Sequence, residues 1–192
     1  MNNICILLNG PPGSGKDTLA KMISDQYGYA VKGFKDQLYE DTAKYFNIPV
    51  EELKARHADR NLKEIPWDRL HMRKPLEHIK VSTRDALIFI SESVYKPVFG
   101  EDIYGIAAVN SCTLLNLTNV VFADSGFRDE AERIIDSFRK VFIFQLHRTG
   151  CSYVGDSRGY LTDLPQMHTL MLEDGKPEKA VKQIMEIVNY YE

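Results

Sequence analysis

The chain has 192 residues, of which 44% are hydrophobic and 27% charged, and its formal net charge is −3. That length suits one domain with a buried core and a small insertion, and the charge disfavours a protein that coats nucleic acid through bulk basicity. The three cysteines lie far apart without CxxC spacing, which indicates neither a disulfide framework nor a zinc site. No apolar run approaches the ~18 residues of a membrane-spanning helix, so we expect a soluble, cytoplasmic protein.

The first 27 residues indicate a strand, a glycine-rich loop and a helix. Ile4–Asn9 (ICILLN) is a short apolar run, typical of a strand buried on both faces. The apolar positions that then recur at helical spacing are Leu19, Ala20, Ile23 and Tyr27. Between strand and helix stands GPPGSGK, residues 10–16, which matches the GxxxxGK phosphate loop in the context that this loop requires.

A phosphate loop turns its backbone N–H groups inward around phosphate, and the N-terminus of the following helix adds positive potential. The candidate nucleotide-binding residues are Gly10, Gly13, Ser14, Gly15, Lys16, Asp17 and Thr18. Lys16 would reach the β and γ phosphates of a nucleoside triphosphate, and ATP is the expected cofactor. Asp17 stands where a Ser or Thr usually binds magnesium, and a triphosphate would repel its carboxylate unless it faces the metal or points outward. Thr18 is therefore the safer polar contact.

Farther along the chain, helical and strand patterns alternate. Helices are predicted over 34–46, 49–56, 84–95 after a cap at Ser82 or Thr83, 103–115, 131–138 and 180–191, and strands over 119–124, 140–147 and 168–172. Residues 58–80 are polar and contain two prolines, which predicts an irregular insertion. Residues 148–165 are rich in glycine and polar residues, which predicts a mobile loop and not packed structure. The alternation predicts a parallel sheet covered by helices on both faces.

A carboxylate ends the second convincing strand. Asp124 follows an apolar run at the place where phosphate-loop proteins hold a magnesium-organising carboxylate. The alternative is a helix-capping Asp. Arg128, four residues later, is either a surface arginine on the next helix or a guanidinium aimed at phosphate.

These segments resemble a known family. GPPGSGKDT (10–18) resembles the loop of nucleoside monophosphate kinases, and the SGKDT form resembles the phage-type deoxynucleoside monophosphate kinases. Three further segments and one longer passage follow in that family's order: residues 33–38, 82–105 and 120–134, and the passage from 146 to 165. The resemblance implies a three-layer α/β/α P-loop NTPase fold with a parallel sheet, as one kinase domain over 1–192 with an acceptor-side insertion at 58–80 and a lid at 148–165. One departure is a longer spacing from Asp124 to Arg128, because Gly126 and Phe127 intervene.

The family resemblance also implies an activity and roles for particular residues. The activity is transfer of phosphate from ATP, with Mg²⁺, to a deoxynucleoside monophosphate. The implied catalytic residues are Lys16, Asp124, Arg128 and Arg148, and the implied acceptor contacts are Lys35, Arg84 and Arg128. The implied lid arginines are Arg148 and Arg158, and the implied metal ligands are Asp124 and Thr18. For the lid arginines, the alternative is a solvated loop charge.

Three other functions remain open at this stage. One is a kinase that phosphorylates a hydroxymethylated pyrimidine, 5-hydroxymethyluracil, in phage DNA, which the basic cluster at 69–80 slightly favours. Another is a non-catalytic ATP-binding sensor, and the third is a small-metabolite kinase such as a phosphomevalonate kinase. We expect a small-molecule nucleotide as the acceptor and no membrane partner; the sequence leaves the oligomeric state open, with a homodimer as one option.

Overall fold

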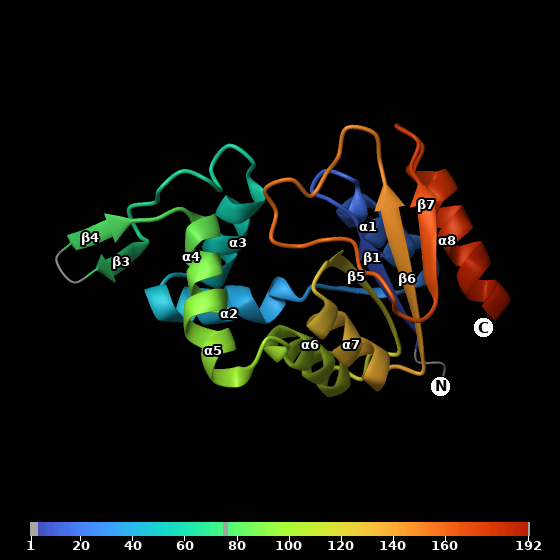
Figure 1. Ribbon diagram of the computed structural model, residues 1–192, viewed down its shortest axis with the longest axis horizontal. Helices are drawn as coiled ribbons and strands as arrows, with labels where there is room; N and C mark the ends of the chain where they lie inside the picture. Colours follow the sequence, from blue (N-terminus) through green and yellow to red (C-terminus); the bar gives the residue numbers. More distant parts are fainter. Residues whose placement is uncertain (1–3, 75–76, 192) are drawn as a thin grey trace. The chain divides into compact units, whose positions relative to one another are not determined.

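The computed structural model describes residues 4–74 and 77–191 (Figure 1). Residue contacts divide them into two compact units. The first contains the described residues up to Phe34 and from Gly105 onward, and the second contains Lys35–Tyr104. The insertion predicted at 58–80 falls within the span of the second unit.

The first unit is built on a five-stranded parallel sheet. Its strands are β1 (Ile4–Asn9), β2 (Ala30–Lys32), β5 (Asn119–Ser125), β6 (Lys140–His147) and β7 (Met167–Met171). They lie in the order β2-β5-β1-β6-β7, and every neighbouring pair is parallel. All six residues of β1 are buried, which explains why its first five residues are continuously apolar.

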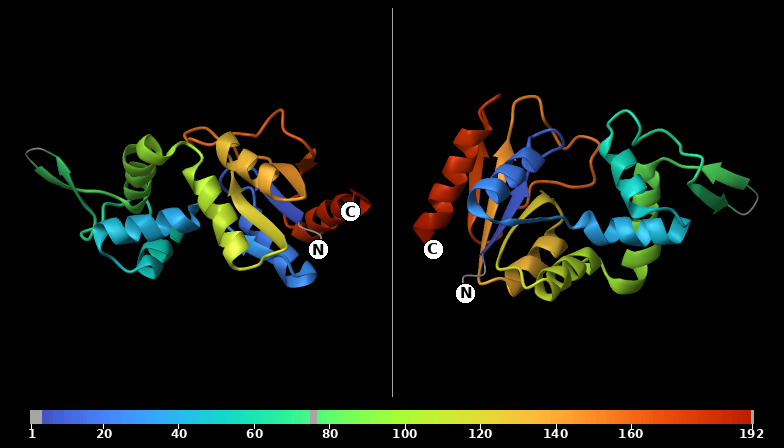
Figure 2. Two further views of the ribbon diagram at one scale, coloured as in Figure 1. Left: turned by 90° about the horizontal axis from the view of Figure 1, so that it is seen from below. Right: turned by 180° about the vertical axis from the view of Figure 1, so that it is seen from behind.

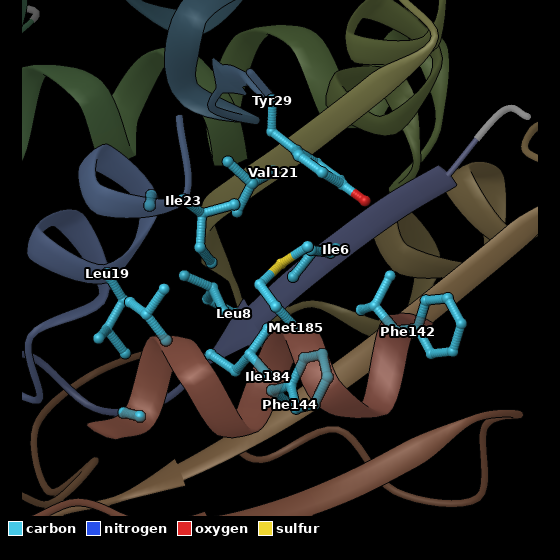
Figure 3. Packing of buried hydrophobic residues seen from close by; sticks show 14 of the residues in the cluster. Ile6, Leu8, Leu19, Ile23, Tyr29, Val121, Phe142, Phe144, Ile184 and Met185 are labelled. Carbon is cyan, nitrogen blue, oxygen red and sulfur yellow. The ribbon is translucent and has the colours of Figure 1, made fainter. Parts of the chain in front are cut away.

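Four helices cover this sheet: α1 (Lys16–Tyr27), α6 (Ile103–Leu114), α7 (Arg128–Ser137) and α8 (Pro177–Tyr191). Helices α1 and α8 can be followed in Figure 2. Because side chains alternate along a strand, Ile6 and Leu8 of β1 pack into the cluster formed with α1 and α8 (Figure 3). Cys5 and Leu7 pack into the opposite cluster, formed with α6 and α7. The predicted parallel sheet covered on both faces is therefore confirmed.

Two details of the first unit differ from the sequence predictions. Tyr27 was expected on the apolar face of α1, but it is 42% exposed and ends the helix beside Gly28, whose φ is 73°. Strand β2 was not predicted, because it has three residues and none of them is fully buried. The three cysteines are free, and Cys5 and Cys112 are buried in the core as small hydrophobic residues.

The second unit is mainly helical. Its elements are α2 (Lys35–Phe46), α3 (Val50–Ala58), β3 (His71–Lys74), β4 (Glu77–Lys80), α4 (Thr83–Phe89), the π-helical segment η1 (Ile90–Tyr95) and α5 (Lys96–Phe99). Leu53, Leu70 and Ile90 are fully buried at its centre. Ser82 caps α4 by accepting a hydrogen bond from the Asp85 N–H, as the sequence predicts.

The prediction that residues 58–80 are irregular throughout is wrong for the two strands of this unit. β3 and β4 pair antiparallel, with His71 opposite Lys80. Each strand has only four residues and lacks the apolar alternation by which a strand is recognised in a sequence. Among the described residues, no helix is long and apolar enough to cross a membrane.

Candidate active site

The loops of the first unit that carry the predicted site residues all leave the sheet at the carboxyl ends of its strands. β1 leads into the glycine-rich loop, β5 ends beside Asp124, and β6 leads into Arg148. Parallel strands present these ends along one edge, where ligands of open α/β sheets bind. The topology therefore gathers residues that lie more than one hundred positions apart in the sequence.

The conformation of the loop requires glycine. Gly13 and Gly15 have φ values of 81° and 96°, in the left-handed region that side chains with a Cβ rarely adopt. Gly10 is constrained by space, because a Cβ there would lie 2.8 Å from the Ser14 Oγ and 3.0 Å from the carbonyl oxygen of Leu146. These contacts account for the GxxGxG spacing of the loop.

The Lys16 ammonium lies inside this loop. The side chain is 7% exposed, and its Nζ donates hydrogen bonds to the carbonyl oxygens of Gly10 and Pro11, the second at 2.8 Å. Lys16 is also the first residue of the 12-residue helix α1, whose N-terminus carries partial positive charge. Positive potential is thus concentrated where an anion would enter.

A pocket continues from the loop toward α8. It is lined by Ser14, Gly15, Thr18, Leu19, Arg148, Leu172, Glu173, Gly175, Lys176, Pro177 and Ala180, with a volume of about 120 Å³. Thr18 therefore faces this space, whereas Asp17 is exposed outside the lining. Sequence reasoning missed residues 172–177, although the Asp-Gly-Lys-Pro turn between the last strand and the last helix was a usable signal for a loop at this edge.

Arg148 connects the two sides of this pocket. Its Nη1 donates to the Gly13 carbonyl oxygen at 3.1 Å, and its Nε donates to Asp174 at 2.7 Å. The structure thus brings the predicted lid arginine into contact with the phosphate loop. At the rim, hydrogen bonds from Lys179 and Lys176 lower the pKa of Glu173 to about 2, so this carboxylate stays ionised.

Asp124 has a defined partner at the end of β5. Its carboxylate accepts a hydrogen bond from the Phe34 N–H at 3.0 Å, which joins β5 to the segment after β2. Asp124 is not the N-cap residue of the next helix, because the N-cap of α7 is Phe127. Asp124 is consequently left at the sheet edge as a candidate site carboxylate.

The segment predicted to be a lid, residues 148–165 (the lid segment), is anchored to the sheet through Asn9. This fully buried side chain ends β1 immediately before the loop. Its Nδ2 lies 3.0 Å from three acceptors, the Ser125 and Gly159 carbonyl oxygens and the Tyr153 hydroxyl, while its Oδ1 accepts from the Leu161 N–H at 2.9 Å. The expectation of unpacked structure is wrong for this part of the segment.

Arg158 is not a solvated loop charge, which corrects the alternative given for it. Its guanidinium binds both carboxylate oxygens of Asp156, and the two side chains are 13% and 10% exposed. The hydrogen bonds that Arg158 donates to Asp156, assisted by the charge of Asp124, raise the pKa of Arg158. The arginine is therefore a fixed cation whose charge interacts favourably with that of Asp124.

Three other predicted site residues, Arg128, Lys35 and Arg84, are not part of the pocket lining. Arg128 is exposed on α7 and donates to Glu132 at 2.7 Å and to the Thr162 carbonyl oxygen at 3.3 Å. Lys35 and Arg84 belong to the second unit, where Lys35 begins α2 and Arg84 forms an ion pair with Glu64 at 3.1 Å. These three residues stay predictions as substrate contacts.

The first unit has suitable donors for a magnesium ion that arrives with a nucleotide. Among residues 4–74 and 77–191, no group of three or more His, Cys, Asp or Glu side chains could hold a metal on its own. A nucleotide-bound Mg²⁺ needs fewer protein ligands, because it keeps several waters and is bound by one or two carboxylates together with phosphate oxygens. The Asp124 carboxylate and the Thr18 hydroxyl fit this oxygen-only chemistry.

No protein-family model matches the chain, and no curated protein matches it in sequence. Solved structures do match. The protein designated APE1195 is 14% identical with a TM-score of 0.50, covering 98% of this chain and 96% of that one. Shikimate kinase from Acinetobacter baumannii, in complex with shikimate, is 12% identical with a TM-score of 0.49 over 100% and 96% of the two chains. The APS kinase CysC of Mycobacterium tuberculosis, in complex with AMPPNP and APS, is 10% identical with a TM-score of 0.48 over 98% of each chain.

At these identities the likeness concerns the fold alone. The likeness to APE1195, together with the parallel sheet, its flanking helices and the loop between β1 and α1, establishes a three-layer α/β/α P-loop NTPase fold, as the sequence predicts.

Proposed function

We propose that the chain is an ATP-dependent phosphotransferase of the nucleoside monophosphate kinase type, with a deoxynucleoside monophosphate as its acceptor. One observation carries the donor half of this proposal. The phosphate loop, with the Lys16 ammonium inside it, opens into a pocket that Arg148 joins to residues 172–177. Such a site suits a ligand with a phosphate chain at one end and a flat, partly apolar group at the other, as in ATP.

The donor would occupy this site in a defined direction. Phosphate oxygens would replace the carbonyl oxygens of Gly10 and Pro11 as the partners of Lys16, because a charged acceptor binds an ammonium more strongly than a neutral one. The base would enter between Arg148 and Pro177, since a planar guanidinium stacks well on aromatic rings. Thr18, which lines the same space, would contact the phosphate chain.

Phosphoryl transfer asks mainly for positioning and charge neutralisation. An oxygen of the acceptor phosphate attacks the γ-phosphorus, the bond from that phosphorus to the bridging oxygen breaks, and ADP leaves. Lys16 and Arg148 would neutralise charge on the donor side, and Mg²⁺ held by Asp124 and Thr18 would polarise the transferred group. The acceptor would bind through Lys35 and Arg84, which rests on the family resemblance.

The experiment compares two lysine variants of one helix. Lys16→Ala should lower transfer of label from [γ-³²P]ATP to a pool of nucleoside monophosphates by at least about 100-fold, while its circular-dichroism spectrum shows that the variant is still folded at the assay temperature. Lys21→Ala is the matched control, because Lys21 is exposed on α1 and pairs only on the surface with Asp25 at 2.8 Å; it should stay within about twofold. Equal activity in the two variants would contradict the phosphate-loop assignment.

A further inference from the structure

Asp156, Arg158 and Gly126 form a small assembly at the carboxyl end of β5. We propose that Asp156 and Gly126 are positioning residues that hold Arg158 against the carboxyl end of β5 before any nucleotide binds, so that a lid cation belongs to the transfer site at rest. This inference rests on the proposed function for its catalytic consequence. The docking itself depends only on contacts within the first unit.

The first support is the way Asp156 grips the arginine. The Arg158 Nε and Nη2 donate to the two carboxylate oxygens of Asp156 at 2.9 and 2.8 Å. The Arg158 backbone N–H also donates to this carboxylate at 2.9 Å. A two-pronged guanidinium–carboxylate pair fixes both the position and the plane of the guanidinium. Asp156 uses two of the five guanidinium N–H donors, so three others can serve a phosphate.

The second support is the absence of a side chain at Gly126. A Cβ at this position would lie 2.7 Å from the Arg158 Cβ and 3.0 Å from its Cγ and Cδ. Real Cβ atoms do not approach so closely, so the aliphatic stem of Arg158 packs directly on the Gly126 backbone. The Gly159 N–H donates to the Gly126 carbonyl oxygen at 3.3 Å, which joins the same two segments. Gly126 has no positive φ, so space and not backbone conformation requires a glycine here.

This contact explains an irregularity in the sequence. Gly126 is one of the two residues that lengthen the spacing from Asp124 to Arg128 relative to the family pattern. Arg128, the residue aligned with the family's arginine, binds Glu132 and the lid carbonyl of Thr162 on the exposed side of α7. Arg158 is the more protected of the two arginines, because its stem packs on Gly126 and its side chain is 13% exposed, against 53% for Arg128. The added glycine thus makes room for a lid arginine at the end of β5.

The consequence is preorganisation. An arginine on a free lid must be ordered whenever substrate binds, whereas a docked arginine is already in place when charge develops on the transferred group. Moving it should therefore lower kcat while leaving ATP binding almost unchanged, because Lys16 and Arg148 hold the donor independently. The negative charge of Asp124, whose carboxylate accepts a hydrogen bond from the Phe34 N–H, also stabilises the charged guanidinium.

The kinetic test is a double-mutant cycle in which phosphoryl transfer from ATP is measured. Gly126→Ala should lower kcat by at least about tenfold and change the KM for ATP by less than about threefold. In the Arg158→Gly background, which removes the atoms that Cβ would meet, the same substitution should have no further effect. Gly159→Ala is the matched control, because no atom lies within 4 Å of a Cβ there; it should retain activity within about twofold. Equal losses from Gly126→Ala in both backgrounds would overturn the inference.

A second readout separates the docking from the activity. In the ligand-free protein, the Arg158 Nε–H should give a resolved, slowly exchanging NMR signal that disappears in Arg158→Gly. Asp156→Asn, which keeps the size of the side chain, should weaken the protection of this signal, and Gly126→Ala should shift it. A rapidly exchanging Arg158 signal in the wild type would overturn the docking. If the signal is protected but the wild type transfers no phosphate to any acceptor, the proposed function fails while the docking stands.

Discussion

Replacing Asn9 should destabilise the first unit strongly, although this residue is not expected to touch substrate. Asn9 is fully buried where β1 ends, and it bonds to β5 and to two positions of the lid segment. Asn9→Ala removes all of these bonds and leaves buried carbonyl and N–H groups without their partner. The loss would be felt at the base of the phosphate loop, one residue away.

The magnitude follows from the donors and acceptors of one amide. The two hydrogens on Nδ2 serve three nearby acceptors, so two full hydrogen bonds can form, and Oδ1 accepts a third. At about 1 kcal/mol for each net bond, the free energy of unfolding should fall by about 3 kcal/mol. A chain of this size loses roughly 2–4 °C of Tm per kcal/mol, which gives a decrease of roughly 6–12 °C.

Urea and thermal unfolding followed by circular dichroism would measure this change. Asn9→Asp should also destabilise the protein, because it replaces two donors by a charged acceptor that faces two carbonyl oxygens. Asn110→Ala, on the exposed surface of α6, is the control and should stay within about 0.5 kcal/mol. A loss below about 1 kcal/mol for Asn9→Ala would refute the assigned bonding network.

Two further predictions concern Arg148 and His168. Arg148→Lys keeps the charge but cannot bond to both Gly13 and Asp174. The KM for ATP should therefore rise about tenfold, which corresponds to about 1.4 kcal/mol, and kcat should change less. An unchanged KM would contradict a role of Arg148 in the donor site. Burial lowers the pKa of His168 below its ordinary value near 6.5, so the unfolded chain takes up this proton first as pH falls. The free energy of unfolding should therefore decrease below about pH 6.5. His168→Phe can keep the stack on Phe144, and its free energy of unfolding should decrease less than that of the wild type between about pH 7.5 and 5.5. Identical pH slopes for the two proteins would contradict this prediction.

The sequence predicted well those parts of the fold that depend on the spacing of residues within one short segment. The strand, loop and helix from Ile4 to Tyr27 occupy consecutive residues, and the apolar runs at 119–124 and 140–147 are long enough to identify buried strands. The capping residue Ser82 was also recognisable, because the cap and its partner Asp85 lie three positions apart.

The parts that escaped prediction depend on distant partners or on short elements. Asn9 forms hydrogen bonds with Ser125 and Leu161, which lie 116 and 152 positions away in the sequence. A local sequence pattern cannot predict contacts over such separations. Gly126 looks like an ordinary turn residue until the stem of Arg158 is found against it. The π-helical segment η1 has the same apolar pattern as the α-helix that was predicted there, so periodicity could not distinguish the two.

The central claim is phosphoryl transfer to a free nucleotide, and one measurement tests it most directly. The wild-type protein would be incubated with [γ-³²P]ATP and magnesium against two acceptor pools, the common ribo- and deoxynucleoside monophosphates and duplex DNA containing 5-hydroxymethyluracil. We predict label on a deoxynucleoside diphosphate and none on the DNA. Label on the DNA alone would contradict the proposed acceptor, and ATP binding without label on either pool would contradict the proposed nucleotide kinase.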